Sequence, residues 1–80
     1  MKFHVGQVLM VTKEFNLFNY QMPSDDEMHE PITMVVGEAL LVTHRDGPEH
    51  DVEIHLLSSL GSRGWRHGAH LPRWVRGMTP

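Results

Sequence analysis

Residues 32–57 are the densest apolar stretch of the chain, and their pattern predicts two strands joined by a short polar loop. In the second arm Val52, Ile54 and Leu56 alternate with polar residues, the period of two expected for a strand with one face in water. The loop, residues 46–50, contains Asp-Gly-Pro, a combination that favours turns. We therefore expect a β-hairpin at the centre of the fold.

Charge pairing and the two apolar stripes predict the register of this hairpin. The expected pairs are Thr43 with Glu53, Arg45 with Asp51, Leu40 with Leu56, and Val42 with Ile54. Opposite charges then lie side by side, and both apolar stripes share one face. A slip of one residue would turn one stripe away from the other, which makes that alternative costly. Ahead of the first arm, Gly37 interrupts the apolar run. It predicts a bend or bulge, so that the parts of the run before and after it can belong to two different sheets.

The remaining elements are short strands and turns. Residues 8–12 are apolar and partly β-branched, as in a buried strand, and residues 14–31 form a long acidic loop. After the hairpin, a glycine-rich turn precedes a short strand at residues 65–67. Pro72 then has no backbone N–H to continue a strand ladder, which predicts a 3₁₀ turn near 72–74 and a last strand within 75–78. The pattern therefore predicts an all-β fold of about five short antiparallel strands.

Length and composition limit the class of protein. The 80 residues suffice for a single domain, 1–80, because a core of this size cannot be divided. The chain has no cysteine, so disulfides and thiolate metal sites are excluded. No apolar run approaches the ~20 residues of a membrane span, and the first residues lack a signal-peptide core. We expect a soluble, cytoplasmic protein with no membrane association.

The net charge of −3 conceals a strong asymmetry. Residues 1–53 carry three basic and ten acidic residues, a charge of −7, whereas residues 54–80 carry four arginines and no acid, a charge of +4. Such an imbalance indicates either internal pairing of the two parts or a surface for an anionic partner.

Two segments resemble signature segments of the SH3-like small barrel. Residues 35–42, VVGEALLV, are similar to the diverging turn of that family, and residues 68–75, GAHLPRWV, resemble its closing segment with a 3₁₀ turn before the last strand. The acidic loop 14–31 sits where the family carries its RT loop. The resemblance implies a single SH3-like barrel. The aromatic residues of the family's proline-peptide groove are not matched, since Val52 and Glu53 replace its tryptophan pair, so the resemblance leaves the ligand open.

Seven histidines raise the question of a metal site. Structural zinc takes about four ligands and catalytic zinc about three. The available groups are the pair His67 and His70 and the loop trio His44, His50 and Asp51. Without cysteine or a recognised spacing, solvated or hydrogen-bonded imidazoles are favoured, and neither a metal nor another cofactor is expected. Protonation of the hairpin histidines should change the charge of that surface between about pH 5 and 7.

A hydrolytic site is not expected either. Three serines lie near two histidines in residues 55–67, but no nucleophile-elbow glycine pattern and no paired carboxylates accompany them. A chain this small also leaves little room for a substrate pocket. The sequence therefore favours a protein that is not an enzyme.

Arginine and tryptophan are interleaved near the C-terminal end of the chain. The candidate partner-binding residues are Arg63, Trp65, Arg66, Arg73, Trp74 and Arg76, together with Phe18 and Tyr20 of the aromatic stretch 15–20. This composition is typical of protein hot spots and also suits phosphate contacts with base stacking. In a second interpretation both indoles fill the core, and the guanidinium groups pair with acids of the loop 14–31, namely Asp25, Asp26, Glu27 and Glu30.

We hypothesise a small non-catalytic protein-binding module, an adaptor or inhibitor that masks the surface of a larger protein. Stand-alone domains of this size are typical of accessory or phage-encoded regulatory proteins. A nucleic-acid-binding protein that uses the same arginines and tryptophans is the alternative, although an acidic chain repels a polyanion except along one face. A metal-dependent, histidine-rich domain is the third hypothesis.

Overall fold

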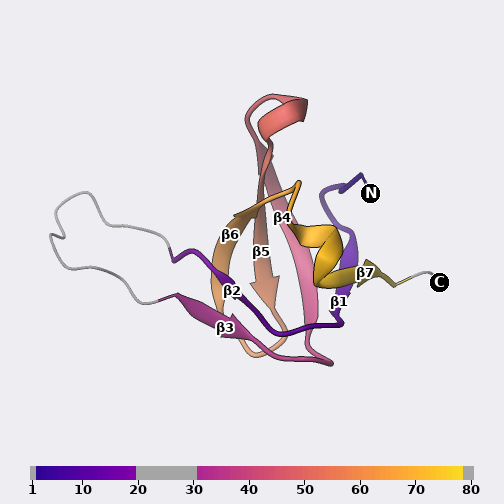
Figure 1. Ribbon diagram of the computed structural model, residues 1–80, viewed down its shortest axis with the longest axis vertical. Coiled ribbons are helices and arrows are strands. Elements are labelled where there is room, and N and C mark those ends of the chain that lie inside the picture. The colour runs from indigo at the N-terminus through magenta and orange to yellow at the C-terminus, as the bar shows by residue number, and fades with distance from the viewer. Residues whose placement is uncertain (1, 20–30, 79–80) are drawn as a thin grey trace, which may run out of the picture.

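A computed structural model describes residues 2–19 and 31–78, and these form strands and two short 3₁₀ helices (Figure 1). The strands are β1 (Val8–Val11), β2 (Phe15–Leu17), β3 (Ile32–Met34), β4 (Ala39–Asp46), β5 (Glu53–Ser58), β6 (Arg63–His67) and β7 (Val75–Gly77). The 3₁₀ helices are η1 (Glu49–Asp51) and η2 (Leu71–Arg73). The all-β prediction is confirmed for the described residues. The expected strand number was too low, because the predicted loop 14–31 contains β2 and is followed at once by β3.

The strands form two antiparallel sheets. One sheet has five strands in the order β6-β5-β4-β1-β7, and the other pairs β2 with β3. Phe18 and Trp65 form an isolated bridge between the sheets, with N–H to carbonyl distances of 2.9 and 3.0 Å in the two directions. Within the described residues no ladder joins β7 to β3, so the hydrogen-bonded strands do not close into a barrel.

The predicted bend at Gly37 is confirmed. It separates β3 of the small sheet from β4 of the large one, and Gly37 has a φ of 95°, a conformation that side chains with a Cβ rarely adopt. The next residue, Glu38, is buried and accepts hydrogen bonds from the Val35 N–H at Oε2 (2.6 Å) and from Ser58 Oγ at Oε1 (2.9 Å). One carboxylate therefore ties the bend to the end of β5.

The register of the central hairpin differs from the predicted one. The observed pairs are Leu40 with Ser58, Val42 with Leu56, His44 with His55, Arg45 with Ile54, and Asp46 with Glu53. The predicted pairing is therefore wrong by two residues up to and including Val42, and by three residues after a bulge between Val42 and His44. A shift of two residues keeps each side chain on its face. The expectation that both apolar stripes share one buried face is accordingly confirmed, because Leu40, Val42, Ile54 and Leu56 are all buried.

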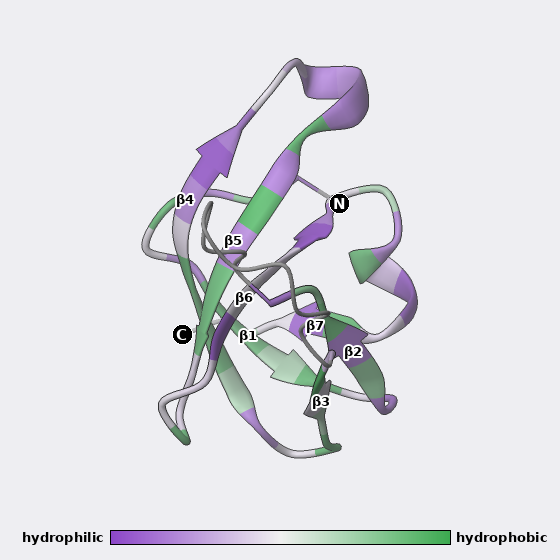
Figure 2. Ribbon diagram, turned by 90° about the vertical axis from the view of Figure 1, so that its left-hand side faces the viewer, coloured by the Kyte–Doolittle hydropathy of each residue, from purple (hydrophilic) through white to green (hydrophobic). Residues whose placement is uncertain are grey.

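The loop of this hairpin explains the error in register. Asp51 belongs to η1 instead of β5, so it is not available as the cross-strand partner of Arg45. Arg45 instead forms an ion pair with Glu49, with Nη2 to Oε2 at 2.8 Å. In Figure 1 this loop projects beyond the rest of the molecule, and in Figure 2 η1 is coloured as hydrophilic.

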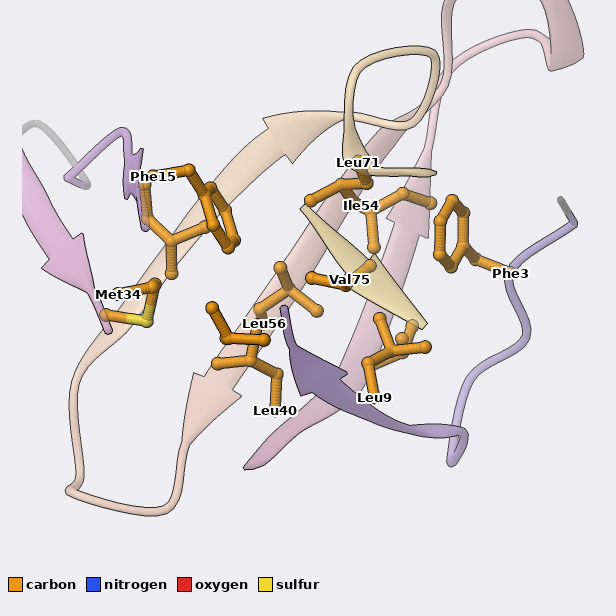
Figure 3. Packing of buried hydrophobic residues seen from close by; sticks show 12 residues of the cluster. Phe3, Leu9, Phe15, Met34, Leu40, Ile54, Leu56, Leu71 and Val75 are labelled. Atoms are coloured by element: carbon orange, nitrogen blue, oxygen red, sulfur yellow. The ribbon is translucent and has the colours of Figure 1, made fainter. Parts of the chain in front are cut away.

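The core lies between the five-stranded sheet, the small sheet and η2 (Figure 3). Its buried residues are Phe3, Leu9, Val11, Phe15, Leu17, Met34, Leu40, Val42, Ile54, Leu56, Leu71 and Val75. Every one of the seven strands except β6 contributes at least one partly or fully buried apolar residue to this cluster or to its rim. Burial of each such side chain stabilises the fold by about 1.5–3 kcal/mol relative to exposure.

The C-terminal elements follow the prediction closely. The 3₁₀ turn expected near 72–74 is η2, which begins one residue earlier at Leu71, and the expected last strand is β7. The Trp74 N–H donates to the Leu71 carbonyl (2.9 Å), which closes the turn that Pro72 begins. Leu71 fills the core, so η2 anchors the segment between β6 and β7.

Candidate functional site

Arg66 lies at the centre of the residues that the sequence singled out. Its Cζ atom lies 4.6 Å from the ring centroid of Phe18 and 4.9 Å from that of Trp74. Its Nη1 atom donates a hydrogen bond to the Asn16 carbonyl (3.0 Å). A guanidinium group within about 6 Å of an aromatic face is attracted by the ring quadrupole. Arg66 therefore connects β6 to the end of β2 and to the residue after η2.

Phe18 and Trp65 extend this contact along the junction of the two sheets. Their ring centroids lie 4.9 Å apart with planes inclined by 50°, and Phe18 remains 39% exposed. Gly64 permits the approach, because a Cβ atom at this position would lie 2.6 Å from the Phe18 carbonyl oxygen. The bridge between the sheets thus requires glycine beside Trp65.

The two tryptophans have different surroundings. Trp74 stacks on Phe15 with a centroid distance of 5.1 Å and an interplanar angle of 7°, and it packs against the core. Trp65 is half-buried, contacts Phe18, and is not among the residues packed against the core. Of the two indoles, only that of Trp74 therefore packs against the core, and neither fills it.

We call Phe18, Trp65, Arg66 and Trp74 the aromatic–arginine cluster. Two histidines border it. The ring of His67 lies 5.2 Å from that of Trp65, and the ring of His70 lies 6.0 Å from His67 and 6.2 Å from Trp74. The pair His67 and His70, noted in the sequence as a metal candidate, thus continues the aromatic surface.

The other predicted site residues are dispersed. Arg63 lies opposite Leu57 on β6, Arg73 is exposed on η2, and Arg76 is exposed on β7, where its Nη2 atom lies 3.8 Å from the sulfur of Met10. Tyr20 lies outside the described residues, as do the loop acids expected to pair with these arginines. Within the described part of the chain, none of Arg63, Arg66, Arg73 and Arg76 forms an ion pair with a carboxylate.

Sequence inspection missed Asn16 and Phe15 as members of this region. Asn16 supplies a backbone carbonyl, which any residue could provide, so its side chain carries no signal. Phe15 was recognised only as part of the aromatic stretch 15–20. Its stacking on Trp74 joins residues that are far apart in the sequence. The ladder between β1 and β7 and the hydrogen bonds from the Thr12 and Lys13 N–H groups to the Trp74 carbonyl bring them near each other.

The metal candidates do not converge in the part of the chain that the structure describes. There, no group of three or more His, Asp or Glu side chains is placed to hold a metal ion. His44 instead lies against His55 on the neighbouring strand, with ring centroids 5.3 Å apart, while His50 and Asp51 lie in η1. Asp51 Oδ1 lies 3.2 Å from His67 Nδ1.

The Ser58 hydroxyl and one cavity are the remaining candidates for a catalytic or ligand-binding group. Ser58 is buried, donates to Glu38 and accepts from the Leu60 N–H (2.9 Å), so its hydroxyl is engaged in the fold. A cavity of about 210 Å³ lies between the N-terminal segment and η1. It is lined by the ion-paired Arg45 and Glu49 and by the neighbouring Asp51 and His67, a mixture of both charges.

Comparison with protein-family models, with curated proteins and with solved structures returned no match. None of the helices in residues 2–19 and 31–78 is long and apolar enough to cross a membrane.

Proposed function

We propose that this chain is an SH3-like module that binds a protein partner through the aromatic–arginine cluster. Three features support the SH3-like architecture: the strand order β6-β5-β4-β1-β7, the β2–β3 hairpin inserted between β1 and β4, and the 3₁₀ helix η2 before the last strand. The bend at Gly37, followed by the buried Glu38, agrees with the diverging turn of that family.

The placement of Arg66 between Phe18 and Trp74 is the observation that carries the proposed activity. Arginine and tryptophan dominate protein hot spots because their large flat groups bury much area and still offer hydrogen-bond donors. Here the guanidinium group is already held by two rings and one carbonyl, so binding requires little further ordering. The half-buried Trp65 and the 39% exposed Phe18 provide apolar area beside it.

The same contacts favour a protein partner over a nucleic acid. Stacking of bases requires open aromatic faces. Trp74 already stacks on Phe15 and also has the Arg66 guanidinium group over its ring, and the same guanidinium group lies over one face of Phe18. The dispersal of Arg63, Arg73 and Arg76 and a net charge of −3 also weaken the case for a polyanion. We therefore assign the module a regulatory role, as an adaptor or inhibitor that covers part of a larger protein.

The test is affinity capture from host extract with the intact chain and three matched variants, followed by quantitative mass spectrometry. We expect Trp65→Ala and Arg66→Ala to weaken binding of the captured partner by roughly 2 kcal/mol or more, the usual hot-spot threshold. Arg73→Ala, an exposed arginine outside the cluster, serves as the control and should retain the partner. Equal capture by all four proteins would contradict the proposal.

A second arm addresses the nucleic-acid alternative. Labelled single-stranded and duplex oligonucleotides are titrated at low salt while tryptophan fluorescence is recorded. Tight quenching that weakens steeply with salt, with a similar loss of slope for Arg66→Ala and Arg73→Ala, would replace the protein-binding proposal by a polyanion-binding one.

A further inference from the structure

The outward face of the five-stranded sheet is apolar where such a face is usually polar. Val8, Leu41 and Leu57 lie directly opposite one another across β1, β4 and β5. Val8 is 39% exposed, Leu41 is 37% exposed, and Leu57 is half-buried. An antiparallel sheet with one face on the core normally carries polar residues on the other face. This row therefore departs from the pattern that solvent alone would favour.

The apolar surface extends beyond this row, at its end on the β7 side and along the neighbouring row. The Met78 N–H donates to the Val8 carbonyl (3.0 Å), which places Met78, 46% exposed, beside Val8 at the edge of the sheet. Met10 and Ala39 pair with each other one row away, on the same face. The outward apolar face is thus defined by Val8, Met10, Ala39, Leu41, Leu57 and Met78. It is hollowed by a depression of about 210 Å³ lined by Val8, Ala39, Leu41 and Leu57, among others.

Arginines border this face at opposite edges of the sheet. Arg63 lies opposite Leu57 on β6, and Arg76 lies opposite Met10 on β7. Neither forms an ion pair with an acid of the described residues. On β5 the nearest outward acid is Glu53, four residues from Leu57 and hence about 13 Å away along the strand. The two edges of the outward apolar face, on β6 and β7, therefore carry positive charge.

We propose that the outward apolar face is a second docking surface and that its occupant is an acidic amphipathic segment of a partner protein. The arginines at the two edges favour an acidic occupant. They disfavour a second copy of this chain, because two copies packed by the same face would bring arginine close to arginine. The dimensions fit a short helix: Met78 to Leu57 spans four strands, about 14 Å, and apolar residues at i, i+4, i+7 and i+11 of a helix span about 16 Å. This face is built on β1, β4 and β5. Trp65 of the aromatic–arginine cluster pairs with His55 and so borders the face at β6, whereas Arg66 pairs with Ile54 and lies on the opposite side of the sheet.

The test uses two synthetic 16-residue peptides with the same apolar residues at helical spacing, one flanked by Glu and the other by Lys. Each is titrated into the ¹⁵N-labelled full chain, and amide shifts are followed by NMR. We expect the Glu peptide to shift amides of β1, β4 and β5, and we expect the Lys peptide to bind at least about tenfold more weakly. A charge reversal at one of the two edges, Arg63→Glu or Arg76→Glu, should weaken the Glu peptide by about threefold to tenfold and make its affinity less dependent on salt.

Substitutions on the face itself complete the design. Leu41→Asp should reduce affinity for the Glu peptide more than about tenfold, whereas Thr33→Asp, an exposed position on β3 with the same added charge, should leave it unchanged. If Leu41→Asp does not fold, the milder Leu41→Thr and the two arginine reversals carry the test. Arg66→Ala, at a position on the opposite side of the sheet, should leave the peptide affinity unchanged, so failure of this proposal and failure of the aromatic–arginine site are distinguishable.

Four results would overturn the proposal. They are an absence of shifts with the Glu peptide, equal binding of the Lys peptide, a dimer in sedimentation that dissociates on Leu41→Thr, and binding to phosphatidylglycerol vesicles through Leu41 in preference to the Glu peptide. The third result would assign the face to a second copy of the chain, and the fourth would assign it to a lipid surface.

Discussion

Removal of the Glu38 carboxylate should destabilise the protein by cutting the link between the bend and β5. Glu38 is 8% exposed and accepts two hydrogen bonds, from the Val35 N–H (2.6 Å) and from Ser58 Oγ (2.9 Å). Ser58 in turn accepts the Leu60 N–H (2.9 Å), so one chain of hydrogen bonds joins two turns. The perturbations are Glu38→Ala, Glu38→Gln, Ser58→Ala and the double variant Glu38→Ala with Ser58→Ala.

The magnitude follows from the partners that each change leaves behind. Hydrogen bonds to a charged group contribute about 1.5–3 kcal/mol each. When Glu38 is removed, water can accept the hydrogen bond of the Val35 N–H in its place, because Val35 is 48% exposed. We therefore expect Glu38→Ala to lower the free energy of unfolding by about 2–4 kcal/mol. Glu38→Gln should cost only about 1 kcal/mol, since the amide oxygen can accept from Val35 while its NH₂ donates to Ser58.

Urea denaturation followed by tryptophan fluorescence measures these differences, with Glu14→Gln, an exposed acid, as the control. Glu38→Ala should lower the melting temperature by at least about 8 °C, given roughly 4–8 °C per kcal/mol in a domain of this size. The double-mutant cycle with Ser58→Ala should give a coupling energy of about 1–2 kcal/mol. A change below about 0.5 kcal/mol for Glu38→Ala, or a coupling energy near zero, would refute the link.

Two further predictions concern the core and the junction of the sheets. Ile54→Ala, at a fully buried position, should cost roughly 2–5 kcal/mol in urea denaturation, and an unchanged melting temperature would contradict its place in the core. Gly64→Ala would place a Cβ atom 2.6 Å from the Phe18 carbonyl oxygen and 2.8 Å from Leu17 Cβ. It should cost about 1–3 kcal/mol and speed the exchange of the Phe18 and Trp65 amides. Gly77→Ala, whose Cβ atom would meet only the flexible end of Gln7 at 3.2 Å, should leave those two amides unchanged.

Local patterning in the sequence determined most of the strands and turns. The alternation that includes Ile54 and Leu56 placed the buried face of β5 correctly, because successive side chains of a strand point to opposite sides. The strand itself begins at Glu53, two residues later than predicted. Gly37 marked the bend between the sheets and Pro72 the 3₁₀ helix η2, because each restricts or permits backbone angles whatever its surroundings. These signals depend on a few adjacent residues, so the amino-acid sequence suffices to read them.

Tertiary structure alone decided which side chains meet. The bulge after Val42 shifts the register of the central hairpin, and η1 removes Asp51 from the ladder. Sequence inspection predicted neither of them. The contact of Arg66 with Phe18 joins residues 48 positions apart, and it exists because Gly64 lets the end of β2 approach β6.

The fold was also needed to tell side chains that pack against the core from side chains that remain exposed. Sequence inspection treated Trp65 and Trp74 as equivalent, but only Trp74 stacks against the core. It likewise assigned Val8 and Leu41 to apolar strands without showing that they share an exposed face. Hydrophobicity indicates that a side chain gains free energy by leaving water, but the order and register of the strands determine whether this chain can bury it or leaves it for a partner.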